Sequence, residues 1–202
     1  MKLHGTSKSR SARSLWAAEE VGAKYEHVPT EVAKAKSPEH LKLNPNGHIP
    51  ALEDNGHVVW ESMAINLYLA QKYDGPLHCA SADVLGLAAQ WSFWAMLEIE
   101  PLLLHLLEHR ALLAEFARDA SAIERNELLL KRPLGVLNDA LAGRDYLAGT
   151  SFTVADLNVA SILIWAKMAR LDMSAYPDLT RWLNACLARP AYARIRAQAR
   201  GK

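Results

Sequence analysis

The chain lacks most of the features that would place it in a special class of protein. Only 2 of its 202 residues are cysteine. Cys79 and Cys186 lie too far apart for a CxxC pair, so neither a disulfide framework nor a zinc site is predicted from them. No apolar run reaches the ~18 residues that a membrane-spanning helix needs, and the opening residues lack the apolar segment of a signal peptide. We therefore expect a cytoplasmic protein with reduced thiols.

An excess of charge of one sign is also missing. The chain has 23 lysines and arginines against 22 aspartates and glutamates, which gives a formal net charge of +1. Nucleic acids and anionic membrane surfaces are recognised through basic patches, so we expect neither of them as a partner. The chain is 50% hydrophobic, with 10 glycines and 9 prolines, as is typical of a globular protein of one or two domains.

Most of the strand-forming signal falls before residue 60, whereas alanine and leucine dominate the rest of the chain. Strand-like segments cover residues 1–4, 25–29, 49–53 and 57–60. Asn55 and Gly56, between the last two, predict a hairpin turn. A helix ending before Gly22 separates the first two strands, and this order predicts a parallel βαβ unit. With a further helix over 62–73, residues 1–75 are predicted to form an α/β domain of the order βαβ–ββα.

A linker over residues 76–82 is predicted to join this domain to an all-helical second domain over residues 83–202. Turn residues without hydrophobic periodicity mark the linker. The first helix beyond it, over 83–109, is long and apolar, and Pro101 should kink it rather than end it. Further helices are expected over 112–142, 153–171, 178–189 and 191–199.

One helix start in the second domain is specified in detail. Thr153 and Asp156 have the spacing of a capping box, in which each side chain accepts a hydrogen bond from the other end of the first turn. Phe152 and Leu157 flank the box as a hydrophobic staple. Such boxes occur in many unrelated helices, so we interpret this one as a folding signal.

Three motifs in this order and spacing resemble the cytosolic glutathione S-transferases, and the resemblance extends over the whole chain. The motifs are Ser9-Arg10-Ser11-Ala12-Arg13 with Glu19-Glu20-Val21-Gly22, then Asn44-Pro45-Asn46-Gly47-His48-Ile49-Pro50-Ala51-Leu52, and then Glu61-Ser62-Met63-Ala64-Ile65. The resemblance, to a serine-type and bacterial-like member, implies a thioredoxin-like first domain and an all-helical second domain. It also implies a homodimer that binds glutathione as co-substrate in the first domain and a small hydrophobic electrophile between the domains.

Glutathione presents two carboxylates, an amine and a thiol, and the resemblance implies a partner for each end. A cis Ile49–Pro50 bond, as the family has it, would turn the backbone groups of Ile49 towards the cysteinyl part of the ligand. Ser62 and the nearby helix amides would hold the γ-glutamyl carboxylate, and Glu61 would pair with the amine. A plain helix cap is the alternative role of Ser62.

The glycine carboxylate of the ligand has two candidate partners. His48 stands where several classes of the family place Lys, Arg or Gln, and a histidine donates a hydrogen bond in either protonation state. An exposed loop histidine without a ligand is the alternative. Lys36 is the second candidate partner for this carboxylate.

The loop after the first strand should carry the residue that activates the thiol. It contains no Tyr or Cys, but in the serine-type pattern the active hydroxyl stands four residues before an arginine, as Ser9 does before Arg13. Helix capping by Ser9, or activation by one of three neighbouring hydroxyls, stays open: Thr6, Ser7 and Ser11. Lowering a thiol pKa from ~8.5 to ~6.5 takes about 2.7 kcal/mol, which one charged-group hydrogen bond and one helix end supply.

Conjugation to an electrophile, or a related attack of the glutathione thiolate on carbon, is the chemistry that remains, because thioltransferase activity would need a cysteine in this loop. Trp94 on the long helix is our candidate for the electrophile pocket. His105 and His109 match an HxxEH string, but no third ligand is marked out, so no metal is expected. The competing function is a non-catalytic glutathione-binding or protein-interaction module of the same fold.

Overall fold

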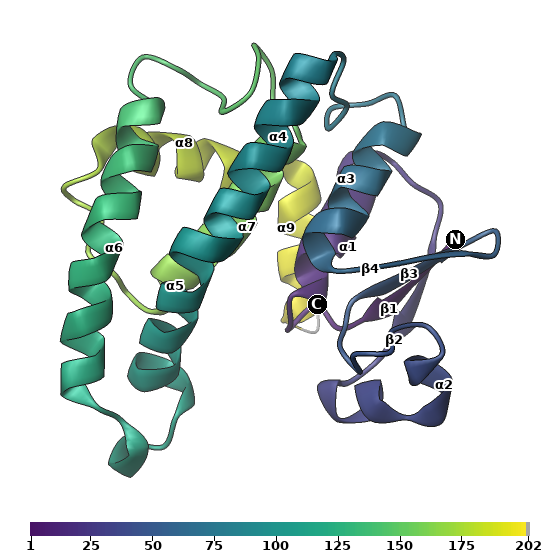
Figure 1. The fold of residues 1–202 in the computed structure, drawn as a ribbon, viewed down its shortest axis with the longest axis horizontal. Coiled ribbons are helices and arrows are strands. Elements are labelled where there is room, and N and C mark those ends of the chain that lie inside the picture. Colours follow the sequence, from purple (N-terminus) through teal and green to yellow (C-terminus); the bar gives the residue numbers. More distant parts are fainter. Residues whose placement is uncertain (201–202) are drawn as a thin grey trace. The chain divides into compact units, whose positions relative to one another are not determined.

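The computed structural model describes residues 1–200 and divides them into two compact units. The first contains Met1–Ala80 together with residues 188–200, and the second contains Ser81–Leu187. The first unit is α/β and the second is all-helical, which confirms the predicted fold class (Figure 1). No helix within residues 1–200 is both long and apolar enough to cross a membrane.

The first unit is built on a four-stranded mixed sheet. Its strands β1 (Lys2–Gly5), β2 (Glu26–Pro29), β3 (Ala51–Asp54) and β4 (His57–Trp60) lie in the order β2-β1-β3-β4. β1 is parallel to β2 and antiparallel to β3, and β3 is antiparallel to β4. Asn55 and Gly56 both have positive φ, 51° and 85°, as a tight hairpin turn requires. The predicted βαβ unit and hairpin are therefore confirmed.

Two helices cover the sheet and supply the core of this unit. α1 (Ser11–Glu20) and α3 (Ser62–Lys72) pack against each other and against the strands (Figure 1). Leu15, Trp16 and Leu69 are among the side chains that they bury. α1 ends where predicted, at Gly22 with φ 63°. The connection from β2 to β3 contains the short 3-10 helix η1 (Val32–Lys36) and α2 (Pro38–Leu41).

The last helix, α9 (Pro190–Ala199), packs on α1 although sequence analysis grouped it with the helical domain. Arg189 forms two hydrogen bonds to Glu20, both of 2.8 Å. The rings of Trp16 and Tyr192 lie 4.9 Å apart, and Arg194 pairs with Glu19. Paired charges and the contact between the two tilted rings thus hold α9 against α1.

The second unit starts with one continuous helical run. It consists of α4 (Ala82–Trp94), a π-helical turn (Ala95–Ile99), α5 (Glu100–Leu107) and a second π-helical turn (Glu108–Leu112). Pro101 lies in the first turn of α5, directly after the first π-helical turn, so its missing N–H falls where the α-helical bonding pattern is already interrupted. The long helix with a disturbance at Pro101 is therefore confirmed.

The next helix begins later than predicted. α6 (Ala120–Ala140) was expected to start at residue 112, but residues 113–119 contain only a 3-10 turn over Glu115–Ala117. The carboxylate of Asp119 accepts a hydrogen bond from the backbone N–H of Ser121 at 2.9 Å. This side chain caps the helix N-terminus and so sets its start.

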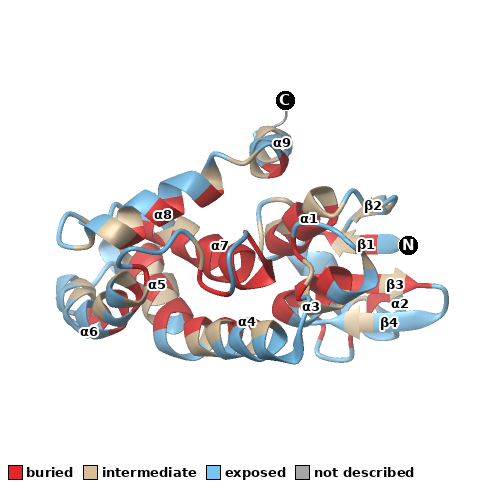
Figure 2. Ribbon diagram, turned by 90° about the horizontal axis from the view of Figure 1, so that it is seen from above, coloured by how far each residue is buried: buried red, intermediate tan, exposed pale blue. Residues whose placement is uncertain are grey.

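α7 (Val154–Met168) is the centre of the helical unit and packs against α4, α5 and α8 (Pro177–Leu187). Figure 2 shows it buried along most of its length. The predicted capping box at its start is confirmed, with Asp156 accepting from the Thr153 N–H at 3.0 Å. Asp156 also accepts hydrogen bonds from the N–H of Leu147 and from Trp182 Nε1, both at 2.9 Å. Burial raises the pKa of this carboxyl, and the hydrogen bonds donated to it act in the opposite direction.

We expect Asp156→Ala to destabilise the protein by about 3–5 kcal/mol, because it leaves several buried donors without an acceptor. A loss of that size is a large part of the stability of a typical domain. Urea unfolding at neutral pH measures it, with Asp139→Ala on the exposed surface of α6 as the control, for which a change within about 0.5 kcal/mol is expected. Equal losses for the two variants would contradict the prediction.

Candidate functional site

The strand directions bring three loops of the first unit to one edge of the sheet. His4 near the end of β1 pairs with Ala51 at the start of β3, and Ala51 pairs with Trp60 at the end of β4. The chain therefore leaves β1, enters β3 and leaves β4 at the same edge. The predicted site residues of these loops, Ser9, Ile49, Pro50, Glu61 and Ser62, gather there for this reason.

Ser9 lies two residues before the start of α1, and its hydroxyl is already hydrogen-bonded to neighbouring residues. It accepts a hydrogen bond from the Ser11 N–H at 3.1 Å, and it donates to Thr6 O at 2.9 Å or to Ser11 Oγ at 3.0 Å. Ser11 is fully buried, whereas Thr6, Ser7 and Ser9 are half-buried. Ser9 therefore caps α1, and of the four hydroxyls Ser11 is the one closed to solvent.

Gly5 allows this loop to pack tightly. A Cβ atom at this position would lie only 2.0 Å from Ser11 Oγ and 3.7 Å from Ile49 Cβ. The φ of Gly5 is 148°, which L side chains rarely adopt. The end of β1, the start of α1 and Ile49 are thus in close contact, and no side chain fits between them.

The Ile49–Pro50 peptide bond is cis, as predicted. Ile49 itself is half-buried. Within residues 1–200, neither its N–H nor its C=O is hydrogen-bonded to another residue. Partly buried backbone groups normally find a partner, so Ile49 offers a donor and an acceptor to an extended peptide.

Glu61 and Ser62 form the start of α3. Ser62 is its first residue and is buried, and Glu61 is exposed with φ 73° and ψ 121°, a strained conformation for a residue with a Cβ. The first turn of α3 contains no acidic side chain, and its leading N–H groups have no partner within the helix. This end of the helix is therefore suited to an anion.

Lys36 and His48 lie together beside the same loop, and both are exposed. Gly47, with φ 65°, is so close to Lys36 that an added Cβ would lie 3.1 Å from Lys36 Cγ. The stem of Lys36 therefore passes over the residue that precedes His48. The fold therefore brings Lys36 close to the loop of His48, the other candidate partner for the glycine carboxylate of glutathione.

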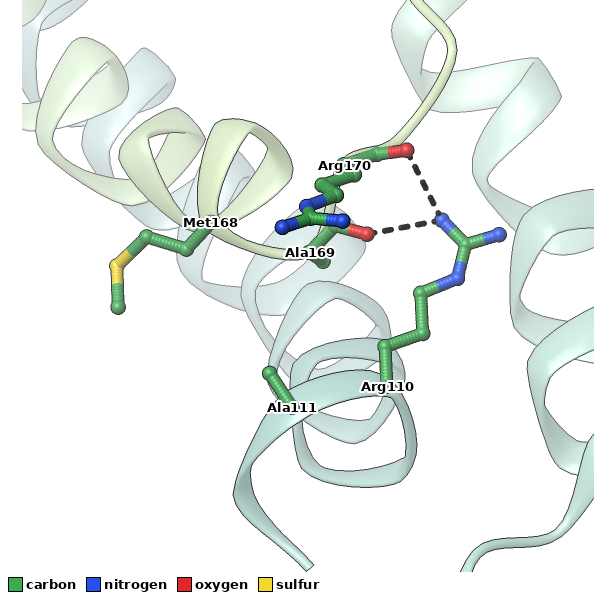
Figure 3. A pocket seen from close by; sticks show the side chains of 5 residues that line it. All are labelled: Arg110, Ala111, Met168, Ala169 and Arg170. Atoms are coloured by element: carbon green, nitrogen blue, oxygen red, sulfur yellow. Dashed lines mark hydrogen bonds between the residues drawn. The ribbon is translucent and has the colours of Figure 1, made fainter.

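Trp94 lies on α4 in the helical unit and is half-buried, with its ring 5.1 Å from that of Trp91 in an edge-to-face arrangement. A cavity of about 380 Å³ in this unit lies elsewhere, lined by Arg110, Ala111, Met168, Ala169 and Arg170 (Figure 3). Arg110 donates to Ala169 O at 3.0 Å and to Arg170 O at 3.3 Å. Its guanidinium thus caps the end of α7, and the cavity contains none of the predicted site residues.

Each of the two histidines of the HxxEH string, His105 and His109, has its Nδ1 atom in a hydrogen bond within the helical unit. His105 Nδ1 lies 2.9 Å from Asn126 Nδ2, which also donates to Ala122 O. His109 Nδ1 accepts from the Asp119 N–H at 3.0 Å. Within residues 1–200, no three His, Cys, Asp or Glu side chains form a group that could hold a metal.

The family models that match this chain are those of the glutathione S-transferase N-terminal domain, over residues 1–71, and C-terminal domain, over residues 94–190. Together they cover most of the chain. The chain belongs to the glutathione S-transferase family. Membership confirms the predicted resemblance, while the serine-type, bacterial-like subtype stays a prediction.

Individual members agree over nearly the full length. The chain is 37% identical to glutathione S-transferase 3 of Zea mays, over 95% of this chain and 91% of that protein. The solved structure of glutathione S-transferase-I bound with lactoylglutathione is 30% identical, with a TM-score of 0.87 over 97% of this chain and 98% of that one. Elongation factor 1-gamma 2 of Oryza sativa is 33% identical over 96% of this chain but only 47% of that longer protein.

Two features of this edge were missed by sequence analysis. The close approach at Gly5 depends on where Ser11 packs, although a glycine at a strand end is a signal that could have suggested it. The strained backbone of Glu61 has no signal in the sequence, because only the path from β4 into α3 demands it. A strained residue retained at such a place points to function rather than to stability.

The strain at Glu61 predicts an unusual ranking of two variants. We expect Glu61→Gly to be more stable than Glu61→Ala by about 1 kcal/mol, since glycine adopts positive φ freely and alanine does not. Glu31 is the matched control, because it is exposed with φ −68°, and there the alanine variant should be the more stable one. Chemical unfolding of all four variants tests this, and the same ranking at both positions would contradict it.

Proposed function

We propose that this protein is a glutathione transferase that stabilises the glutathione thiolate for attack on a small hydrophobic electrophile. The observation that carries the proposal is the common sheet edge, where a helix-capping hydroxyl, an unpaired extended backbone and a free helix N-terminus meet. Glutathione has a thiol, a central peptide and a terminal carboxylate to match these three. The family membership of the chain supports the same conclusion.

In this mechanism the chain binds glutathione as an extended peptide. The N–H and C=O of Ile49, beside Pro50, pair with the cysteinyl part, as an added strand would. Ser62 and the first amides of α3 hold the γ-glutamyl carboxylate, and Glu61 pairs with the amine. Lys36 and His48 face the glycine carboxylate at the other end.

Ser9 then acts on the thiol. In the free protein its hydroxyl hydrogen bonds Thr6 O or Ser11 Oγ, but a thiolate is a charged and therefore stronger acceptor. The hydrogen turns to the sulfur while the Ser11 N–H still bonds the Ser9 oxygen. A bond of this kind contributes ~1.5–3 kcal/mol and the N-terminus of α1 another ~0.3–1 kcal/mol, enough to keep most of the thiol ionised at neutral pH without a general base.

The electrophile pocket belongs to the helical unit in this proposal, with Trp94 as one of its walls. The competing function is a non-catalytic glutathione-binding or protein-interaction module of the same fold. Retention on immobilised glutathione together with turnover of an aryl halide distinguishes the two. A transferase shows both, a binding module shows retention alone, and an interaction scaffold shows neither.

The role of Ser9 predicts a separation of binding from activation. Ser9→Ala should leave glutathione affinity nearly unchanged but raise the pKa of the bound thiol by about one to two units, which lowers turnover near neutral pH by roughly ten- to a hundredfold. Ser62→Ala should do the reverse, weakening affinity roughly tenfold while the bound thiol keeps its pKa. Thiolate absorbance against pH and calorimetry measure the two effects.

Thr6→Ala and Ser7→Ala are the controls for the choice of hydroxyl. A wild-type titration curve for Ser9→Ala together with a raised pKa for one of these controls would show that Ser9 is the wrong hydroxyl. If no variant shifts the pKa, the backbone amides and the helix end alone stabilise the thiolate.

We also propose a homodimer formed through the long first helix of the second unit. Phe93 and Leu97 are 60% and 74% exposed and lie four residues apart, on one face of that helix. Light scattering should give about twice the chain mass of 22.4 kDa. The double variant Phe93→Ser and Leu97→Ser should shift the mass towards the monomer, whereas Phe116→Ser, at a residue that is 94% exposed, should not. A monomer mass for the wild type at micromolar concentration would contradict the proposal.

A further inference from the structure

The peptide group between His48 and Ile49 is held from one side by two buried donors. His40 Nε2 lies 2.8 Å from His48 O, and Asn44 Nδ2 donates to the same oxygen at 2.9 Å. His40 is 4% exposed and Asn44 is 1% exposed. A carbonyl oxygen accepts two hydrogen bonds, so this one is fully used inside the unit.

The other contacts of Asn44 and the chemistry of the carbonyl show that both groups donate to His48 O. The Asn44 Oδ1 atom accepts from the N–H and the side-chain amide of Asn46 at 3.0 and 3.3 Å, which leaves the Asn44 amide nitrogen to donate. Because a carbonyl only accepts, His40 Nε2 must carry a hydrogen. The backbone supports the arrangement, since the Asn44 N–H bonds His40 O at 2.9 Å.

The direction of the Ile49 N–H follows from the planarity of the peptide. The His48–Ile49 bond is trans, so its N–H points opposite to its C=O. With the oxygen held between His40 and Asn44, the hydrogen is directed away from both of them. Rotating the peptide plane would break two buried hydrogen bonds, so the N–H is fixed before a ligand arrives.

We infer that His40 and Asn44 are positioning residues for glutathione, holding the Ile49 N–H in place for the cysteinyl carbonyl of the ligand. The inference rests on the proposed function and adds two residues that do not themselves touch the ligand. Their effect is preorganisation. Affinity is gained because the Ile49 N–H already has its bound orientation, so no entropy is lost in ordering it when glutathione binds. Affinity for glutathione should therefore depend on them, whereas the chemistry at Ser9 should not.

Substitutions that remove each donor test this. Asn44→Asp keeps the shape and the acceptor oxygen but replaces the donor with an oxygen that repels the carbonyl, so the Kd for glutathione should rise about tenfold or more. His40→Leu should raise it about three- to tenfold, and His40→Gln, which retains an N–H donor, should recover part of that loss. For all three variants, the pKa of the bound thiol should stay within about 0.3 units of wild type and kcat at saturating glutathione within about twofold, a split that general loss of structure would not give.

Lys42→Gln is the matched control, because it makes the same change of net charge in the same connection at an exposed residue and should change Kd by less than about twofold. Equal weakening by Lys42→Gln and Asn44→Asp would overturn the inference, because long-range charge would then explain the effect. Unchanged glutathione affinity in folded Asn44→Asp and His40→Leu would also overturn it. A wild type that does not bind glutathione would overturn the proposed function itself.

A measurement on the wild type alone covers the case in which the variants fail to fold. In ¹⁵N–¹H spectra, the His40 Nε2–H should be visible and protected from exchange, and the Ile49 amide proton should move downfield when glutathione is added. An Ile49 amide that does not respond to saturating glutathione would overturn the inference.

Discussion

The pairing of β3 between β1 and β4 is the constraint on which the site depends. Leu3 and Leu52 face each other across β1 and β3, and both are completely buried. A slip of one residue would put either Ala51 or Glu53 in the place of Leu52. One slip leaves a small side chain and the other a carboxylate against Leu3, so the register is strongly specified. That register places the three loops and the N-termini of α1 and α3 at one edge of the sheet.

The site consists largely of backbone groups in fixed positions, and the tight packing around Gly5 maintains them. The start of α1, the end of β1 and Ile49 are in contact at Gly5, and Ser14 Oγ on α1 donates to Ser62 O at 3.4 Å. The protein segments proposed to bind the thiol and the γ-glutamyl carboxylate of glutathione are therefore held together through α1. Towards its far end, α1 is held by ion pairs to Arg189 and Arg194 and by the contact between the rings of Trp16 and Tyr192.

Because the site consists largely of fixed backbone groups, it needs few charged side chains. The proposed anion partners are a helix N-terminus, hydroxyls, an exposed lysine and a histidine, and the net charge of the chain is only +1. Backbone and hydroxyl dipoles in fixed positions take the place of flexible charged side chains. Because these donors already have their bound orientation, binding loses no entropy in ordering them. The two hydrogen bonds on the His48 carbonyl are an example of that fixation.

The sequence by itself determined the features that local signals encode. The elements could be placed in the right order from three kinds of signal: the turn glycines Gly22 and Gly56, the capping box at Asp156 and the hydrophobic periodicities. The three sequence motifs identified the family. The start of α6 is set by a further local signal, the cap of Asp119 on the Ser121 N–H, which sequence analysis missed. Tertiary structure alone decided the packing of α9 on α1 and the burial of Ser11. It also decided the strained φ of Glu61 and the hydrogen bonds from His40 and Asn44 to His48 O. These features depend on contacts between residues far apart in the chain or on how a loop folds back on itself, and neither leaves a periodic signal in the sequence.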